Sequence, residues 1–249
     1  MRRTWPVLLF AMTWPTVATL LYFVTLASPE AQAEGANPLL RAAYFGTKVI
    51  QFALPVVWLG WWCGEDVRPA WPSWKGLSLG VGFGLLVFTL MMVLYFGGLR
   101  DSSLMQRTVV PLRAKVADFG AAKPSDFILL GAFITLMHSL LEEYYWRWFV
   151  FGQLDRYVPT PGAIVLSGLA FAAHHVVVLA VYFPNRLWLA GLLGLGVGVG
   201  GMFWAWLYHR TGSIWAGWIS HALIDAAIMV IGYEMLFAPN YNVFSRPLD

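Results

Sequence analysis

Long apolar stretches alternate with short polar ones along almost the whole of this 249-residue sequence. Each long stretch has about 20 residues or more, enough for an α-helix rising about 1.5 Å per residue to cross a hydrocarbon core of about 30 Å. The pattern predicts an all-α protein, a polytopic membrane bundle of about seven transmembrane helices. The predicted spans are 5–26, 39–62, 76–96, 127–151, 162–182, 187–208 and 213–237.

Residues 101–125 differ from these spans because they carry several basic side chains. Their apolar side chains nevertheless recur at intervals of three and four, which is typical of one face of a helix. We predict an amphipathic helix, bent or restarted at Pro111, that lies on the membrane surface or over one end of the bundle. Its apolar face would consist of Met105, Val109, Leu112, Val116 and Phe119.

The second and third spans carry features that bear on packing. Lys48 and Gln51 lie inside the second span and need interior or interfacial partners, while Pro55 predicts a kink. In the third span, small residues recur at every fourth position, which lets membrane helices approach closely. That ridge consists of Gly76, Gly80 and Gly84.

The first apolar run is followed by Ala31-Gln32-Ala33, which resembles a signal-peptidase site. The run is about 22 residues long against 7–15 for the core of a signal sequence, so we expect a retained first span. We divide the chain into three parts. These are an N-terminal part with three spans and the amphipathic connector (1–125), a four-span core (126–237) and a polar tail (238–249).

Composition agrees with a membrane protein. The chain is 59% hydrophobic and only 12% charged, about half the charged fraction of a soluble domain. Its 14 Trp, 17 Phe and 10 Tyr suit positions at the lipid–water interface. The net charge of +3 is too small and too scattered to indicate a nucleic-acid partner. Cys63 is the only cysteine, which excludes an intrachain disulfide and a thiolate metal cluster.

The charges give conflicting indications of orientation. Arg2 and Arg3 precede the first span, and the connector 28–38 carries acidic but no basic residues, which together place the N-terminus inside. By alternation this orientation puts the basic segment 101–125 outside, against the positive-inside rule. We expect the N-terminus inside because the first span often dominates.

One run within the fourth predicted span places charged residues among aromatic ones. It reads H-S-L-L-E-E-Y-Y-W-R-W-F, from His138 to Phe149. An ionised group inside hydrocarbon costs several kcal/mol, so such residues usually face a bundle interior or a wet cavity and mark a functional site.

Helical geometry separates the two acids of this run. Successive residues point about 100° apart, so Glu142 and Glu143 face different directions. Glu143 and Arg147 are four residues apart in the favoured acid-before-base order, which predicts a buried supporting ion pair. Glu142 shares its stripe with His138 and is the carboxylate left for chemistry. The alternative to a catalytic site is that these charged residues form an ion pair that only joins two helices.

Ionisable residues are few in the last four spans. His221 and Asp225 are four apart and share one helix face. If the spans alternate in direction, Glu142 and His221 fall in the same leaflet, with His175 nearer mid-membrane. We therefore predict that three helices converge on one buried polar pocket. Besides His138, these ionisable residues are Glu142, Glu143, Arg147, His174, His175, His221, Asp225 and Glu234.

Three motifs carry a family resemblance. They are E-E-x-x-x-R at 142–147, F-x-x-x-H at 171–175 and H-x-x-x-[N or D] at 221–225, the last preceded by G-S-I-W at 212–215. In this order and spacing the sequence resembles the CAAX-protease and bacteriocin-processing family (CPBP, or Abi) of intramembrane endopeptidases, in particular type II CAAX proteases. The resemblance covers about residues 125–235, and the first three spans contribute nothing to it.

The resemblance implies an intramembrane endopeptidase that cleaves a peptide bond near the C-terminus of a membrane-associated protein or peptide. By that likeness Glu142 and His175 hold and activate a water, with Glu142 as general base, and His221 and position 225 stabilise the oxyanion. A buried carboxylate that shares a water with an imidazole suits proton transfer near neutral pH. The residues expected to support this catalytic core in 126–237 are Glu143, Arg147 and His174.

This sequence departs from the family pattern at two positions. His174 stands beside His175 and competes for its role, although the motif spacing selects His175. Asp225 replaces the amide that donates a hydrogen bond in many relatives, and an ionised aspartate would repel an oxyanion. Asp225 must therefore be protonated, orient His221 or bind a cation.

The third option, a cation at Asp225, also allows a zinc hypothesis. In it, Glu142, His175 and His221 hold Zn²⁺ and leave one coordination position for water. The H-E-x-x-H helix of common zinc proteases does not occur in the sequence. We favour glutamate catalysis without a metal over zinc, and expect no other cofactor.

The expected partners are the lipid bilayer and a membrane-anchored or transmembrane substrate, without nucleic acid. The expected location is the bacterial inner (plasma) membrane, as a multi-pass integral protein. The alternative from another class is a non-catalytic protein that keeps the family fold, either a scaffold or a transporter in which Glu142, His175 and Asp225 relay protons. Inverted repeats would favour a transporter, and the sequence shows none.

Overall fold

The computed structural model describes residues 4–28, 36–72 and 74–238. Seven helices within these ranges are long and apolar enough to cross a membrane, and no strand occurs in them. The prediction of an all-α, multi-pass membrane bundle is therefore confirmed. The sequence features outside the described residues are Arg2, Arg3, the Ala31-Gln32-Ala33 stretch and the tail beyond Ala238.

Most spans combine α-helical and π-helical segments. The first three are α1 (Thr4–Thr19) with η1 (Leu20–Thr25), α2 (Pro38–Pro55) with η3 (Val56–Trp62), and α3 (Trp74–Leu94) with η4 (Tyr95–Leu99). The fourth consists of α5 (Pro124–Ala132), η5 (Phe133–His138), α6 (Ser139–Glu143), η6 (Tyr144–Phe151) and α7 (Gly152–Leu154). The last three are α8 (Thr160–Tyr182), α9 (Leu187–Thr211) and α10 (Ile214–Phe237).

The change of helix type in the second span falls at the predicted proline. The α-helical segment ends at Pro55, and π-helical hydrogen bonding begins at the next residue. Proline has no N–H to donate and its ring crowds the preceding turn, so it disturbs the regular ladder at this point.

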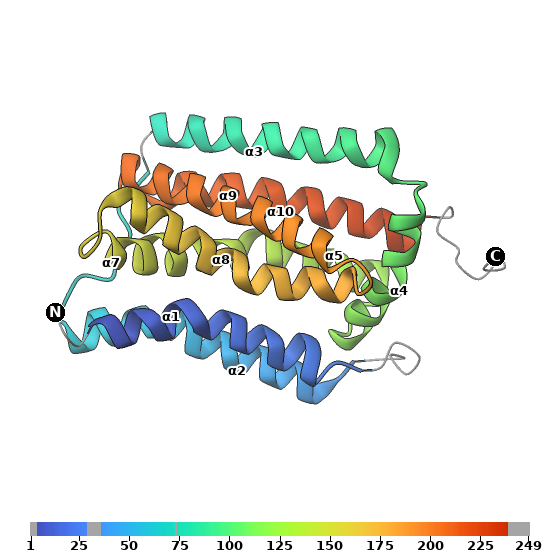
Figure 1. Ribbon diagram of the computed structural model, residues 1–249, viewed down its shortest axis with the longest axis horizontal. Coiled ribbons are helices and arrows are strands. Elements are labelled where there is room, and N and C mark those ends of the chain that lie inside the picture. The colour runs from blue at the N-terminus through green and yellow to red at the C-terminus, as the bar shows by residue number, and fades with distance from the viewer. Residues whose placement is uncertain (1–3, 29–35, 73, 239–249) are drawn as a thin grey trace.

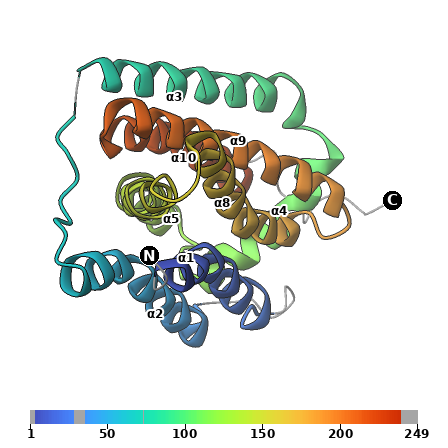
Figure 2. The same cartoon turned by 60° about the vertical axis from the view of Figure 1, so that its left-hand side comes forward.

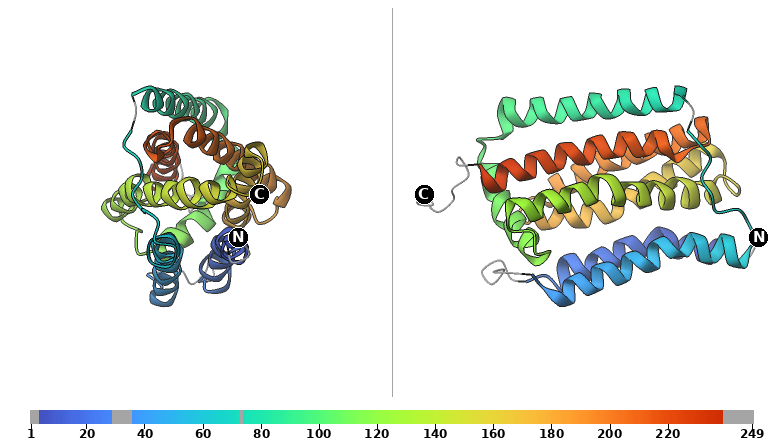
Figure 3. Two further views of the ribbon diagram at one scale, coloured as in Figure 1. Left: turned by 90° about the vertical axis from the view of Figure 1, so that its left-hand side faces the viewer. Right: turned by 180° about the vertical axis from the view of Figure 1, so that it is seen from behind.

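The helices lie side by side, with α1 and α2 on one side of the bundle and α3 on the other (Figure 1). Between them lie the fourth span, α8, α9 and α10, as the view from behind in Figure 3 also shows. Helix α8 packs along α9, and α10 packs along α3. The fourth span touches α1 through Tyr145, whose hydroxyl donates to the backbone oxygen of Ala11 at 2.7 Å.

The contact between α3 and α10 is close because α3 presents glycines to it. A Cβ added at Gly80 would overlap the backbone of Ala216, and one at Gly84 would press on Leu223 and Ser220. The predicted ridge of small residues is thus confirmed as a packing face. Gly82, on another face of α3, is exposed and a Cβ there would meet no atom within 4 Å.

The segment between the second and third spans crosses one end of the bundle, from α2 to α3 (Figure 2). Arg156 holds it by donating to both carboxylate oxygens of Glu65, at 2.9 and 2.8 Å. Tryptophans flank the segment, and Trp61 and Trp74 are 86% and 88% exposed. Exposed tryptophans at helix ends suit the lipid–water interface.

Helix α4 (Ser103–Asp118) packs against the ends of α8 and α10 and so covers the opposite end of the bundle (Figure 1). Val109 is buried with Tyr95 and Met235, while Val116 is buried with Phe127. The predicted amphipathic helix is confirmed in its position over the bundle end. It runs through Pro111 without interruption, so the predicted restart does not occur.

We predict that Gly80→Ala lowers the free energy of unfolding by about 1–3 kcal/mol, because the new methyl group overpacks the α3–α10 contact. The matched control is Gly82→Ala, which adds the same methyl group in open space and should be neutral or stabilising by about 0.5–1 kcal/mol. Unfolding of the detergent-solubilised protein measures both. Equal effects of the two substitutions would contradict the close packing of α3 on α10.

Candidate active site

The two adjacent glutamates lie in α6, a short α-helical segment between the π-helical segments η5 and η6. Departures from the α-helix of this kind occur frequently at functional sites. Both carboxylates are buried, since Glu142 is 2% and Glu143 0% exposed. The prediction that these acids face the interior of the bundle is confirmed.

Side chains from several helices surround the Glu142 carboxylate. Its Oε1 atom lies 3.2 Å from His138 Nε2, 3.7 Å from His174 Nε2 and 3.9 Å from Lys48 Nζ. Its Oε2 atom lies 3.9 Å from His221 Nε2. Helices α2, α8 and α10 thus meet the fourth span at this carboxylate, as the predicted convergence on one polar pocket requires.

Glu143 has a different set of partners, because it points to another side of the helix. Its Oε1 atom accepts a hydrogen bond from His221 Nδ1 at 3.0 Å and lies 3.4 Å from Arg147 Nη1. The predicted Glu143–Arg147 pair is therefore present, and it also holds His221. With Nδ1 as the donor to Glu143, the Nε2 atom of His221 is left facing Glu142 and, at 3.8 Å, Asp225 Oδ2.

Aromatic rings enclose the charged groups around Glu143. The guanidinium carbon of Arg147 lies 4.4 Å from the centre of the Phe171 ring and 4.8 Å from that of Trp204. Trp204 also stacks on His221, with 4.3 Å between the ring centres and 18° between the planes. Such contacts stabilise a cation and exclude water, which strengthens the electrostatic interactions inside.

The two neighbouring histidines of α8 differ in their surroundings. His175 donates from Nδ1 to the backbone oxygen of Phe171 at 2.9 Å, which leaves its Nε2 atom as an acceptor. His174 is only 4% exposed, and its ring lies parallel to that of Trp146. One potential ligand atom from each of Glu142, His174 and His175 lies within 4.8 Å of the others.

This cluster differs from the predicted zinc set, because His174 takes the place of His221. Its donors fit zinc only in part. A zinc-bound histidine usually donates its second N–H to an acceptor. His175 does so, whereas His174 Nδ1 is buried without a hydrogen-bond partner among the described residues.

Some contacts of the site were missed at the sequence level. Lys48 was expected to need a partner, yet nothing in the sequence pairs it with Glu142 from a distant span. His138 shares the stripe of Glu142, and this spacing is the signal that could have added it to the site. The Glu143–His221 contact depends on how α6 meets α10 and leaves no signal. Glu234 does not join the site, because it binds Tyr95 and Arg100 instead.

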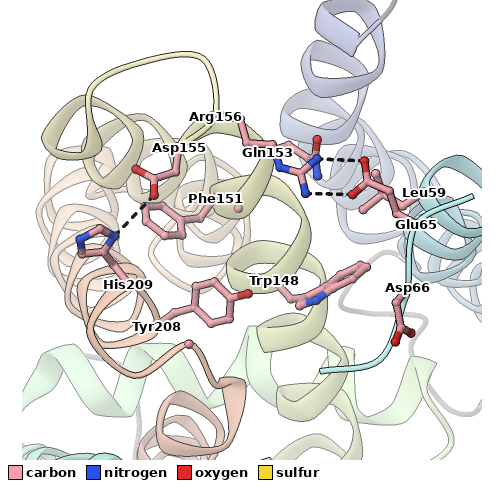
Figure 4. A pocket seen from close by; sticks show the side chains of 12 residues that line it. Leu59, Glu65, Asp66, Trp148, Phe151, Gln153, Asp155, Arg156, Tyr208 and His209 are labelled. Carbon is pink, nitrogen blue, oxygen red and sulfur yellow. Dashed lines mark hydrogen bonds and ion pairs between the residues drawn. The ribbon is translucent and has the colours of Figure 1, made fainter. Parts of the chain in front are cut away.

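A separate polar cavity of about 310 Å³ lies at the end of the bundle, where η6 meets α7 (Figure 4). Its wall includes the Glu65–Arg156 pair and Asp155, whose Oδ2 atom lies 3.4 Å from His209 Nδ1. Neither Glu142 nor any of its partners lines this cavity. The cavity is therefore distinct from the glutamate–histidine site.

The fold and site together define a multi-pass helical membrane protein with a buried carboxylate–imidazole centre. Residues 124–227 match the family described as type II CAAX prenyl endopeptidase, Rce1-like. The resemblance carried by the motifs is therefore confirmed over this segment. The match includes the site residues of the last four spans but not Lys48. No curated protein and no solved structure matches the chain.

We predict that Glu143→Gln lowers the free energy of unfolding by about 3–5 kcal/mol, because Arg147 is 2% exposed and would lose its buried ion-pair partner. The double variant Glu143→Gln/Arg147→Met should regain much of this stability, since it removes both charges. Unfolding in detergent measures the three proteins. A Glu143→Gln variant as stable as the wild type would show that the buried pair does not hold the site.

A second prediction concerns the Glu65–Arg156 pair outside the spans. The hydrogen bonds from Arg156 hold the pKa of Glu65 below its ordinary value of 4.5. A lowered pKa stabilises the folded state above pH 4.5, and this contribution is lost as the pH falls through the lowered pKa.

Hydrogen-exchange protection of residues 63–72 should therefore fall by at most about five-fold between pH 7 and pH 3, as suits an exposed pair. Protection factors remove the intrinsic dependence of exchange on pH. Glu65→Gln should show the lower protection at both pH values. Wild-type protection that does not change with pH would contradict the contribution of this pair.

Proposed function

We propose that this protein is an intramembrane endopeptidase that hydrolyses a peptide bond of a membrane-associated protein or peptide, near the substrate C-terminus. Glu142 is the general base. The observation that carries the proposal is the buried Glu142 carboxylate, which His138, His174 and His221 surround at 3.2–3.9 Å. The Rce1-like match over 124–227 supports a proteolytic reaction at this centre.

The reaction follows from the chemistry of these groups. A water held between Glu142 and the acceptor Nε2 of His175 gives a proton to Glu142 while its oxygen bonds to the carbonyl carbon. The π electrons of the carbonyl move onto its oxygen. The tetrahedral intermediate then collapses, the C–N bond breaks, and the leaving nitrogen takes the proton from Glu142. One water is consumed, and a carboxyl and an amino terminus are formed.

His221 is suited to stabilise the negative charge of that intermediate. Its Nδ1 donates to Glu143, so a second proton on Nε2 would point toward Glu142 and Asp225. Three carboxylates lie within 3.9 Å of the ring, where they would attract the positive charge of a doubly protonated imidazole. In this proposal Asp225 supports the charge of His221 and is not itself a donor to the oxyanion.

The charges of the cluster favour catalysis without a metal. Glu142, Glu143 and Asp225 contribute three negative charges when ionised. Lys48, Arg147 and a doubly protonated His221 contribute three positive ones, so the cluster is neutral when all six groups are charged. A Zn²⁺ ion would leave an excess of two positive charges in a buried site, which is costly. If zinc binds, Glu142, His174 and His175 would hold it, and it would supply Lewis-acid activation of water.

The depth of the site determines the class of substrate. Glu142, His174, His221 and Lys48 each lie about two turns or more inside their spans, which is about 10 Å or more along the helix axis. A scissile bond must reach this depth, which a membrane-anchored or transmembrane segment can do. We further propose that 126–237 forms the catalytic core, and that 1–125 completes its walls.

The test uses wild-type protein in liposomes with a panel of membrane-anchored reporter peptides, both lipidated and unlipidated, and mass spectrometry of the products. Wild type should cleave at least one reporter. Glu142→Gln and His175→Ala should each slow that cleavage by about 100-fold or more, because each removes a partner of the reacting water. A chelator should leave the wild-type rate unchanged.

Glu234→Gln is the matched control, because it removes a carboxylate of the same bundle that lies outside the site. It should cleave at the wild-type rate once folded. Cleavage by Glu142→Gln at the wild-type rate would refute its role as base. A loss of activity with chelator that Zn²⁺ restores would refute metal-free catalysis, and a wild type that cleaves no reporter would contradict the protease function.

A further inference from the structure

Helix α2 lies outside the segment that matches the endopeptidase family, yet it brings two polar side chains to the site. Lys48 Nζ lies 3.9 Å from Glu142 Oε1 and donates to Gln51 Oε1 at 3.2 Å. Lys48 is 8% exposed and Gln51 0%. Two such buried polar residues inside a membrane span need a functional explanation.

The hydrogen-bonding capacity of this pair is only partly used. The ammonium group of Lys48 has three N–H donors, and among the described residues Gln51 Oε1 is its hydrogen-bond acceptor. The Gln51 Nε2 group is buried and has no hydrogen-bond partner among those residues. Lys48 thus has unused donors beside Glu142, and its neighbour Gln51 adds an unused amide donor. A buried donor without a partner is rare in folded proteins and needs an explanation.

The proposed reaction needs such donors. The carbonyl oxygen becomes negative when water adds, and the largest catalytic effects come from donors fixed at that oxygen. Asp225, at the position where an amide could donate, carries no N–H group. His221 offers one proton at most on the side of Glu142, because its Nδ1 proton is held by Glu143.

The distance from Lys48 to Glu142 fits a contact with the reacting carbonyl. A water bound to Glu142 lies about 2.7 Å from it, and a donor to the developing oxyanion lies about 2.7–3.1 Å from that oxygen. An ammonium 3.9 Å from the base is therefore within reach of an oxygen attached to the carbon under attack. It is too close to the base to bind a substrate terminus several residues away, since each extended residue spans about 3.3 Å.

We propose that Lys48 and Gln51 donate hydrogen bonds to the oxygen of the scissile carbonyl as it becomes an oxyanion. This inference rests on the proposed endopeptidase function and adds two catalytic residues from α2 to it. When the carbonyl π electrons move onto the oxygen, hydrogen bonds from Lys48 Nζ and Gln51 Nε2 stabilise the negative charge there until the C–N bond breaks. The N-terminal part of the chain thereby completes the catalytic domain.

The test compares wild type, Lys48→Met and Gln51→Met on a membrane-anchored peptide that the wild type cleaves. Gln51→Met keeps the length of the side chain, Lys48→Met shortens it by one atom, and both substitutions remove the N–H donors. We expect kcat to fall by about 100-fold, with KM changed by less than about two-fold, because the lost contact forms in the transition state. Gln51→Glu is a near-isosteric second variant in case Gln51→Met misfolds, and it should be equally slow.

Lys115→Met is the matched control, because Lys115 is another buried lysine that pairs with Asp118 in α4, away from the site. Its folded fraction should cleave with the wild-type kcat. If Lys115→Met lowers kcat as much as Lys48→Met, the loss reflects removal of a buried charge, and the proposed contact is refuted.

A second measurement distinguishes contact with the carbonyl from an effect on Glu142. The same peptide is made with sulfur in place of the scissile carbonyl oxygen, because sulfur is a weaker hydrogen-bond acceptor. The wild type should cleave this thio-peptide more slowly than the oxygen peptide. The ratio of the oxygen-peptide rate to the thio-peptide rate should shrink by about 10-fold in Lys48→Met and in Gln51→Met, because these variants have already lost the donors.

The outcomes separate this inference from the proposed function. If Glu142→Gln abolishes cleavage while both α2 variants keep the wild-type kcat, the endopeptidase stands and the inference fails. If Lys48→Met is slow but retains the full wild-type thio ratio, Lys48 acts through Glu142, and contact with the carbonyl is refuted. If the wild type cleaves no peptide at all, both the function and the inference are contradicted.

Discussion

The Glu143 carboxylate, shared between Arg147 and His221 inside the bundle, is the interaction on which the rest of the site depends. An isolated ion in hydrocarbon costs several kcal/mol, so each buried acid requires a cation at a fixed place. Arg147 provides that cation from the same helix, and His221 provides a polar partner from α10. Because Glu143 fixes the Nδ1 atom of His221, the Nε2 atom is directed toward Glu142. In the proposed mechanism, Glu143 therefore supports the site, and the adjacent Glu142 carries out the chemistry.

Close helix packing stabilises this arrangement. Lipid tails are as apolar as the helix surfaces, so the hydrophobic effect does little to hold helices together within a membrane. The glycines of α3 bring α3 against α10, the helix that carries His221. Gly201 of α9 similarly lies beside Phe171 and Arg147, where a Cβ would press on the ring of Phe171. The outer surfaces expose large apolar side chains to lipid, while the polar residues meet inside. The bundle thus holds the polar groups of this site by shape as much as by charge.

The seven spans and their approximate limits could be predicted because they depend on local hydrophobicity and helix length alone. The Glu143–Arg147 pair and the stripe of Glu142 with His138 could also be predicted, since both follow from spacing along one helix. The contacts of Lys48 with Glu142 and of His221 with Glu143 could not. Each joins residues far apart in the sequence, and depends on how helices rotate and pack against one another. The π-helical segments around α6 change that rotation and have no evident signal in the sequence.

The central claim is that side chains from separate helices meet around one water at Glu142. The most direct measurement is an experimental structure of the protein in a lipid nanodisc, at a resolution that shows ordered water. We expect one water within hydrogen-bonding distance of both the Glu142 carboxylate and His175 Nε2, with Lys48 Nζ on the same side of the carboxylate. A structure in which His175 or Lys48 faces lipid, or in which Glu142 is bound only by a structural ion pair, would contradict the account.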